Sequence, residues 1–162
     1  MCTGDHQLKE MIFMGSSIAI SDFAYFCNSS TSFYLTSLDI QQCGLTGYHL
    51  KEIGKLINLK YLSANTTLLS NDILHLGSLL KLERLDMNFI ETGNGTIEAL
   101  SKNPNPRLHT LRLYRNEIQD YDMQFFNGNF PSLTELSLCA NELTDEGLKT
   151  LASSNIRIIE KT

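Results

Sequence analysis

Residues 133–151 read L-T-E-L-S-L-C-A-N-E-L-T-D-E-G-L-K-T-L, and their spacing recurs along the whole chain. Leucines alternate with other residues around Leu136 and Leu138, which predicts a short strand with one face in a core. Asn141 follows where the strand should end, and Thr144 can cap a short helix that starts behind it. The stretch therefore predicts one strand–turn–helix unit.

The same spacing defines units upstream and one partial unit downstream. Their first apolar residues are separated by 27, 24, 23, 26, 25 and 23 positions. These residues are Leu8, Leu35, Leu59, Leu82, Leu108, Leu133 and Ile156. The first unit has Ser16 at the asparagine position, and the unit from Leu82 has Ile90 and Thr92 where asparagine and an aliphatic residue are expected. A fixed period of this length indicates a solenoid of stacked coils.

The pattern L-x-x-L-x-L-x-x-N-x-L resembles that of the leucine-rich repeat superfamily. The resemblance implies an α/β fold, a right-handed solenoid or horseshoe of about six or seven coils. A parallel sheet would line its concave side and short helices its convex side. The unit lengths and the run from Leu143 to Leu148 look like the ribonuclease-inhibitor-like and cysteine-containing repeat types. No linker interrupts the series, so residues 1–162 are expected to form one domain.

The asparagine of each unit is expected to bond backbone groups at the bend and to form a ladder between coils. Asn116 and Asn141 hold this position, and Cys43 and Thr67 are accepted variants of it.

The return segments have helical spacing. We expect a helix over Phe23–Cys27 capped by Ser21-Asp22, one from Thr46 to Leu56 and one over 96–102 ended by prolines. Their inward residues are predicted as Phe23, Phe26, Cys27, Tyr48, Leu50, Ile53, Leu56, Ile73, Leu76, Leu80, Met123, Phe126 and Phe130.

Composition excludes several functions. The net charge is −5 and no run of basic residues occurs, which argues against nucleic-acid binding. No apolar stretch approaches the ~20 residues of a membrane span, and the N-terminus lacks the features of a signal peptide. Four well-separated cysteines without a C-x-x-C pair favour a reducing compartment, so we expect a cytoplasmic protein.

Residues two, four and six positions after each first leucine should point out of the concave sheet. Aromatic and arginine side chains, which dominate interface energetics, gather on the middle coils. The predicted partner-binding residues are Tyr61, Arg84, Asp86, Asn88, Phe89, Arg112, Tyr114 and Arg115. In the alternative interpretation these are ordinary solvated side chains, and Asp86 pairs with Arg84 or Arg112 within the chain.

No constellation predicts catalysis, a metal site or a cofactor. His6, His49, His75 and His109 share no ligand spacing with one another and are expected to be solvated. Cys139 is predicted as an inert thiol on the outward face, and no glycine-rich phosphate loop is present.

These observations predict a non-catalytic protein-recognition scaffold, such as an adaptor, that binds a partner protein through the concave sheet. The alternative is a structural or assembly subunit that associates through its terminal coils. A third hypothesis follows from the resemblance, because the family includes activators of small GTPases. Their arginine-bearing rim loosely resembles Arg112 and Arg115.

Overall fold

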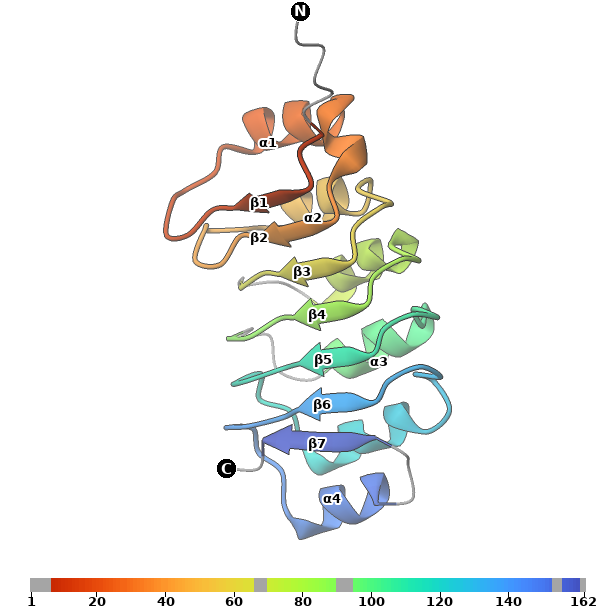
Figure 1. Ribbon diagram of the computed structural model, residues 1–162. Coiled ribbons are helices and arrows are strands. Elements are labelled where there is room, and N and C mark those ends of the chain that lie inside the picture. The colour runs from red at the N-terminus through yellow and green to blue at the C-terminus, as the bar shows by residue number, and fades with distance from the viewer. Residues whose placement is uncertain (1–6, 66–69, 90–94, 153–155, 161–162) are drawn as a thin grey trace, which may run out of the picture.

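The computed structural model describes residues 7–65, 70–89, 95–152 and 156–160. Within them seven strands form a single parallel sheet, and each strand pairs with the next one along the chain (Figure 1). The strands are β1 (Glu10–Ile12), β2 (Ser37–Asp39), β3 (Tyr61–Ser63), β4 (Arg84–Asp86), β5 (Thr110–Arg112), β6 (Glu135–Ser137) and β7 (Arg157–Glu160). This arrangement confirms the predicted α/β solenoid.

The strands align in the register that the repeat spacing predicts. Leucines three residues after the start of each unit lie side by side across the sheet, and each is buried beneath it. They are Leu38, Leu62, Leu85, Leu111 and Leu136. In the first unit Met11 pairs with Leu38 in the same register, although it is half-buried because no described coil covers it.

Return helices cover one side of the sheet and leave the other side open (Figure 1). Four are α-helices: α1 (Ile20–Cys27), α2 (Gly47–Ile53), α3 (Thr96–Lys102) and α4 (Asp145–Leu151). Three are 3₁₀ helices: η1 (Thr31–Tyr34), η2 (Ser70–Ser78) and η3 (Asp120–Phe126). Helices α1, α2, η2, α3, η3 and α4 each pack against the next in this order, and η1 packs against α1, so the chain winds as a stack of coils. None of the described helices is long and apolar enough to span a membrane.

Most predicted core residues are buried, but two residues of the return segments that were predicted to face inward, Tyr48 and Leu80, are exposed. Tyr48 is 76% exposed, because it lies about 200° around α2 from Leu50, which faces the core. Leu80 is exposed and Leu79 is buried instead. The segment before it is a 3₁₀ helix, whose period of three residues places Ile73, Leu76 and Leu79 on one face.

The predicted cap of the first helix is also wrong. Helix α1 begins at Ile20, its N-cap is Ala19, and no side chain caps it. Ser21 and Asp22 lie inside its first turn. The cap predicted at Thr46 is confirmed, and it forms a capping box with His49, whose side chain accepts from the Thr46 backbone N–H at 3.1 Å.

The last strand departs from the predicted register. Leu136 pairs with Ile158 instead of Ile159, and an irregularity before Ser137 restores the predicted pairing at Glu160. One extra residue on β7 is accommodated there, as in a β-bulge.

The inter-coil ladder is present wherever its residues are described. Asn116 Nδ2 donates to the Met87 carbonyl at 2.7 Å, and Asn141 Nδ2 donates to the Leu113 carbonyl at 2.7 Å. Cys43 Sγ contacts the equivalent carbonyl of the first coil, that of Phe13, at 3.4 Å. Cysteine therefore substitutes for asparagine here, as predicted. Thr67, Ile90 and Thr92 lie outside the described residues.

The acidic side chain of Asp122 is also buried. Asp122 in η3 accepts a hydrogen bond from the Gln119 backbone N–H at 2.9 Å, and its Oδ1 has no partner within the described chain. Burial raises the pKa of this carboxyl, and the charge of Glu98 adds to the effect. Asp120, two residues earlier, is half-buried and accepts hydrogen bonds from Thr144, which lower its pKa.

Replacing Asn116 by Ala should destabilise the fold by about 2 kcal/mol, because the buried Met87 carbonyl loses its donor. Urea unfolding measures this directly. Asn127→Ala, at an exposed position after η3, is the matched control and should change stability by less than about 0.5 kcal/mol. Equal stability of the two variants would show that the ladder contributes nothing.

Asp122→Asn should gain stability relative to the wild type as the pH rises above about 4, because a raised native pKa disfavours the charged carboxylate that the wild type must bury. Asp120→Asn should show the opposite trend, since the lowered pKa of Asp120 stabilises the wild type at higher pH. Urea unfolding of the three proteins across pH 4–7, a range of roughly three units, tests both signs. Parallel pH profiles would contradict the assignment.

Candidate functional site

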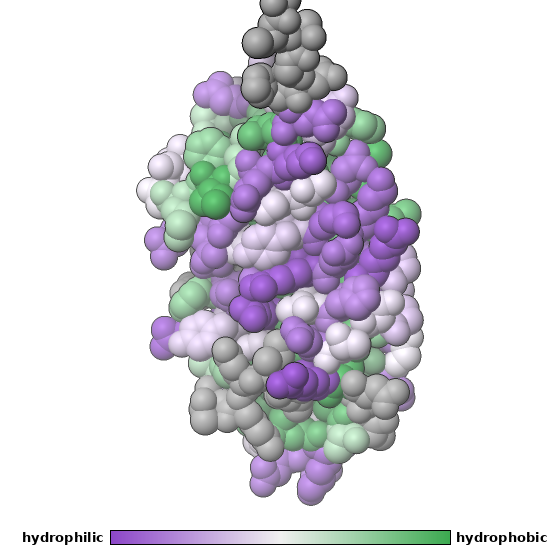
Figure 2. Space-filling model, in the orientation of Figure 1, coloured by the Kyte–Doolittle hydropathy of each residue, from purple (hydrophilic) through white to green (hydrophobic). Residues whose placement is uncertain are grey.

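The open face of the sheet is mainly polar. Figure 2 shows hydrophilic side chains over its middle strands, and apolar side chains gathered toward the β1 end. The apolar residues exposed on and just after β1 are Ile12, Phe13 and Met14. The eight residues predicted from the sequence fall into two groups with different surroundings.

In the first group the side chains of Tyr61, Arg84 and Asp86 contact one another. Arg84 donates to Asp86 through Nε at 3.0 Å and Nη2 at 2.6 Å, and its guanidinium lies 5.2 Å from the centre of the Tyr61 ring. The Tyr61 hydroxyl donates to Asp86 Oδ2 at 3.4 Å. Hydrogen bonding to Asp86 raises the pKa of Arg84, and burial raises the pKa of Tyr61. Asp86 is buried, so this group is chiefly an internal network, as the alternative interpretation anticipates.

Asn88 has a structural contact as well. Its Oδ1 accepts a hydrogen bond from the Tyr114 backbone N–H at 2.9 Å. The side chain thus joins the fourth coil to the fifth and fixes the position of Tyr114.

The second group is open to solvent. The rings of Phe89 and Tyr114 meet edge to face at 5.1 Å, and the Arg115 guanidinium lies 6.0 Å from the centre of the Tyr114 ring. Phe89 is 46% exposed. We call Phe89, Tyr114 and Arg115 the aromatic–arginine cluster. Arg112 is the last residue of β5, just before Tyr114 and Arg115, and within the described residues its guanidinium makes no ion pair.

A repeated backbone conformation places this cluster. The seventh residue after the start of a unit has a positive φ in every coil where it is described. These residues are Gly15 (67°), Gln42 (57°), Phe89 (58°), Arg115 (54°) and Ala140 (55°). Phe89 donates its backbone N–H to the Tyr114 carbonyl at 2.8 Å, and Arg115 donates to Cys139 at 3.2 Å. The turn therefore sets a positive φ at this position whichever residue occupies it. The side chains at this position form a column at the bend after the sheet.

The sequence offers no local signal for this column. Glycine is the residue that tolerates positive φ without cost, and only Gly15 fits that rule among the five. The repeat spacing could have located it, because all five residues share one position in the unit.

A hollow of about 380 Å³ opens beside the cluster. Phe89, Arg115, Glu117, Ala140 and Glu142 line it. Glu117, Ala140 and Glu142 are absent from the predicted surface, because they follow the strands and do not belong to the alternating sheet positions.

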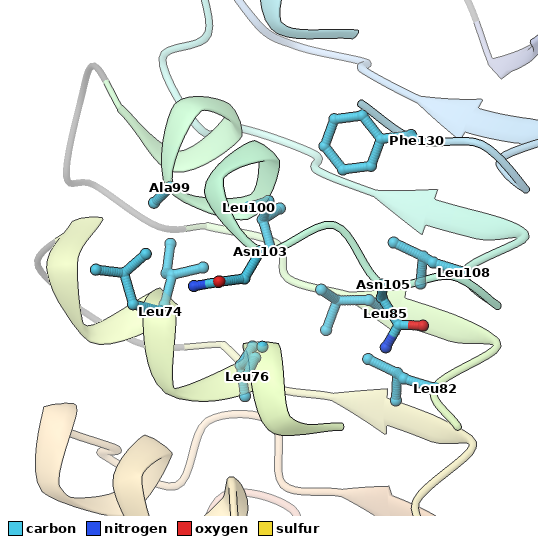
Figure 3. A pocket seen from close by; sticks show the side chains of 12 residues that line it. Leu74, Leu76, Leu82, Leu85, Ala99, Leu100, Asn103, Asn105, Leu108 and Phe130 are labelled. Carbon is cyan, nitrogen blue, oxygen red and sulfur yellow. The ribbon is translucent and has the colours of Figure 1, made fainter. Parts of the chain in front are cut away.

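A second, internal gap has about 20 Å³ and lies between η2, α3 and the sheet (Figure 3). Leucine side chains surround it, and Asn105 lies beside Leu82 and Leu85. The Asn105 side chain donates to the Leu79 carbonyl and accepts from the Arg107 backbone N–H. A gap of this size holds one water at most, so it is a packing feature.

Two predictions about titratable side chains are wrong. His49 is buried instead of solvated: its ring bonds Thr46 and lies 3.1 Å from the Ile18 carbonyl, which ties α2 to the first coil. Cys139 is 8% exposed and is not a surface thiol. His75 and His109 are exposed, and His6 lies outside the described residues.

The described part of the chain brings no three His, Cys, Asp or Glu side chains together in a way that could hold a metal ion. Its three described cysteines, Cys27, Cys43 and Cys139, are free and buried. Burial raises the pKa of the Cys27 thiol to about 12, so this thiol is protonated at neutral pH.

A family model described as Leucine Rich repeat matches residues 131–152, the unit that holds β6 and α4. No curated protein matches the chain. Among solved structures, an internalin from Listeria monocytogenes strain 4b F2365 is similar, with a TM-score of 0.64 and 24% sequence identity. The match covers 88% of this chain and 37% of the internalin, so the chain spans little more than a third of that protein's length.

Neither comparison distinguishes repeat types, so the ribonuclease-inhibitor-like type stays a prediction. The matched unit, its recurrence in register along the sheet and the shared solenoid architecture have one common explanation. The chain has the fold of a leucine-rich repeat solenoid, and residues 131–152 match the family's repeat.

Proposed function

We propose that the chain recognises a partner protein, without catalysis, through the open face of β4–β6 and the adjoining bend. Arg112, Phe89, Tyr114 and Arg115 make the central contacts. Phe89 supports this proposal most strongly. A side chain other than glycine in the left-handed region costs roughly 1 kcal/mol, and an exposed phenyl ring adds no core packing.

The fold does not require an aromatic residue at that position. Gly15, Gln42 and Ala140 occupy the equivalent position in other coils. An exposed aromatic ring in an unfavourable backbone conformation is therefore costly for folding but suited to a contact, since rigid aromatic and arginine side chains dominate interface energies.

The surroundings of Arg112 favour the same surface. Arg84 on the preceding strand is held by Asp86, whereas Arg112 is unpaired within the described chain. A partner carboxylate can pair with Arg112 without breaking an internal ion pair. Tyr61, Arg84, Asp86 and Asn88 then support the surface from behind and beside it.

A cytoplasmic location belongs to this proposal. The three described cysteines are buried free thiols, and they fit a compartment in which thiols stay reduced.

Phe89→Gly should weaken partner binding about tenfold or more while leaving stability within about 1 kcal/mol of the wild type. The contact is lost, but glycine adopts the same positive φ without strain. Capture of partners from a lysate with quantitative mass spectrometry finds the partner, and titration of the purified pair gives the affinity.

Gln42→Gly is the matched control, because it makes the same backbone change two coils away from the cluster. Arg112→Ala combined with Tyr114→Ala should reproduce the loss caused by Phe89→Gly. An unchanged set of partners in the cluster variants would refute the proposed surface.

A second candidate function is assembly with other chains through the β1 end. Ile12 is 60% exposed and Met14 is 64% exposed, and β1 is the first strand of the described sheet. A strand with an unpaired edge and exposed apolar side chains is prone to association.

If that end associates, the wild type should sediment as a larger species with rising concentration, and Ile12→Glu with Met14→Glu should abolish the change. A wild-type monomer at all concentrations in analytical ultracentrifugation would rule out self-association. The cluster variants described above should leave the sedimentation unaltered.

A further inference from the structure

The hollow beside the aromatic–arginine cluster has a defined chemical character. Its volume of about 380 Å³ lies at the small end of the range for ligand pockets, and it opens on the same bend that carries Phe89. A whole small ligand would be weakly enclosed there, but one long side chain of a bound protein would fit.

Two glutamates line this hollow. Glu117 and Glu142 are both exposed, and within the described chain neither forms an ion pair with a cation. Glu142 accepts a hydrogen bond from the neutral Gln119 side chain at 2.7 Å, which orients it without neutralising it. The one basic side chain at the rim, Arg115, contacts the Tyr114 ring. The hollow therefore carries an excess of negative charge.

The backbone that bears these carboxylates is held in place. Asn141 Oδ1 accepts from the backbone N–H groups of Asn116 and Ile118, at 2.8 and 3.1 Å. Glu142 donates its own N–H to the Ile118 carbonyl at 2.9 Å. Both carboxylates thus project from segments joined by the inter-coil ladder, so little ordering is needed before binding.

Two apolar residues, Phe89 and Ala140, also line the hollow, together with Arg115. The Phe89 ring lines one part of the hollow, and Ala140 lines another with only a methyl group. Lysine and arginine have long aliphatic stems that pack on apolar surface while the charged head reaches polar groups. An acidic side chain would fit the apolar walls but would be repelled by the two carboxylates.

We propose that this hollow receives a lysine or arginine side chain of the partner protein, with its stem against Phe89 and its cationic head between Glu117 and Glu142. This inference rests on the proposed function, because it assigns the partner chemistry at one end of the same surface. The partner is therefore a protein with an exposed basic residue, and Arg112 on the sheet pairs with an acidic residue of that partner.

The test uses a library of random twelve-residue peptides, of roughly the length that can cross the cluster and the hollow. Phage carrying the library are selected on the wild-type protein and, separately, on the Glu117→Gln/Glu142→Gln double variant. Peptides from the wild type should be enriched in lysine or arginine, and those from the variant should lack this enrichment.

Affinities of a selected peptide then give the magnitude. The double variant should bind it about five- to thirtyfold more weakly, the effect of two solvent-exposed ion pairs. Higher salt should weaken wild-type binding more than variant binding. Asp145→Asn/Glu146→Gln removes the same charge from exposed α4 and should leave the affinity unchanged.

Selected peptides without basic enrichment, or equal affinity for the wild type and the Glu117/Glu142 variant, would overturn the inference. The proposed function is judged separately with the protein partner. If Phe89→Gly loses that partner and the double glutamine variant retains it, the surface stands and the basic side-chain assignment fails. If neither variant weakens binding of the protein partner, the proposed surface and the basic side-chain assignment are both refuted.

Discussion

Hydrogen bonds that reach from a side chain at the bend to the preceding coil, seen in three coils of the described chain, govern this structure. Strands of three or four residues bury little apolar surface each, and neither strand nor helix would be stable alone. Asn116, Asn141 and Cys43 each reach back to the same carbonyl in the coil before. Asn141 also accepts two backbone N–H groups of that coil. The ladder thus satisfies buried polar groups that a bend between strand and helix would leave unpaired.

The same bend produces the functional surface. The residue before the ladder position has a positive φ in each coil where it is described, including Gly15 and Phe89, which Ser16 and Ile90 follow in the sequence in place of asparagine. The scaffold can then carry any side chain at that position for a similar cost in backbone strain. Phe89 and Arg115 occupy it on adjacent coils, and Ala140 leaves space beside them. The aromatic–arginine cluster and the acidic hollow are therefore two consequences of one repeated turn.

Charged side chains on the sheet differ in whether they form ion pairs within the fold, and composition alone does not show this difference. Arg84 and Arg112 lie on adjacent strands at different positions, since Arg112 is in register with Asp86 and Arg84 with Thr110. Of the two, only Arg84 forms an ion pair with Asp86. Arg84 is therefore ion-paired within the fold, whereas Arg112 can pair with an acidic residue of a partner. A comparable contrast separates Glu83, which pairs with Lys60, from Glu117, which forms no ion pair within the described chain.

The sequence alone determined the architecture, because the spacing of leucines fixes which side chains face the core and so fixes the parallel register. It also located Arg112, Tyr114 and Phe89 on one surface. It missed what depends on contacts between coils: the burial of His49 and Cys139, the 3₁₀ period that buries Leu79, and the irregular pairing of β7. Only the tertiary structure could separate the internal Tyr61–Arg84–Asp86 network from the open cluster and reveal the hollow at Glu117 and Glu142. Residues more than twenty positions apart in the sequence meet there because the coils stack, and pairing between them has no local sequence signal.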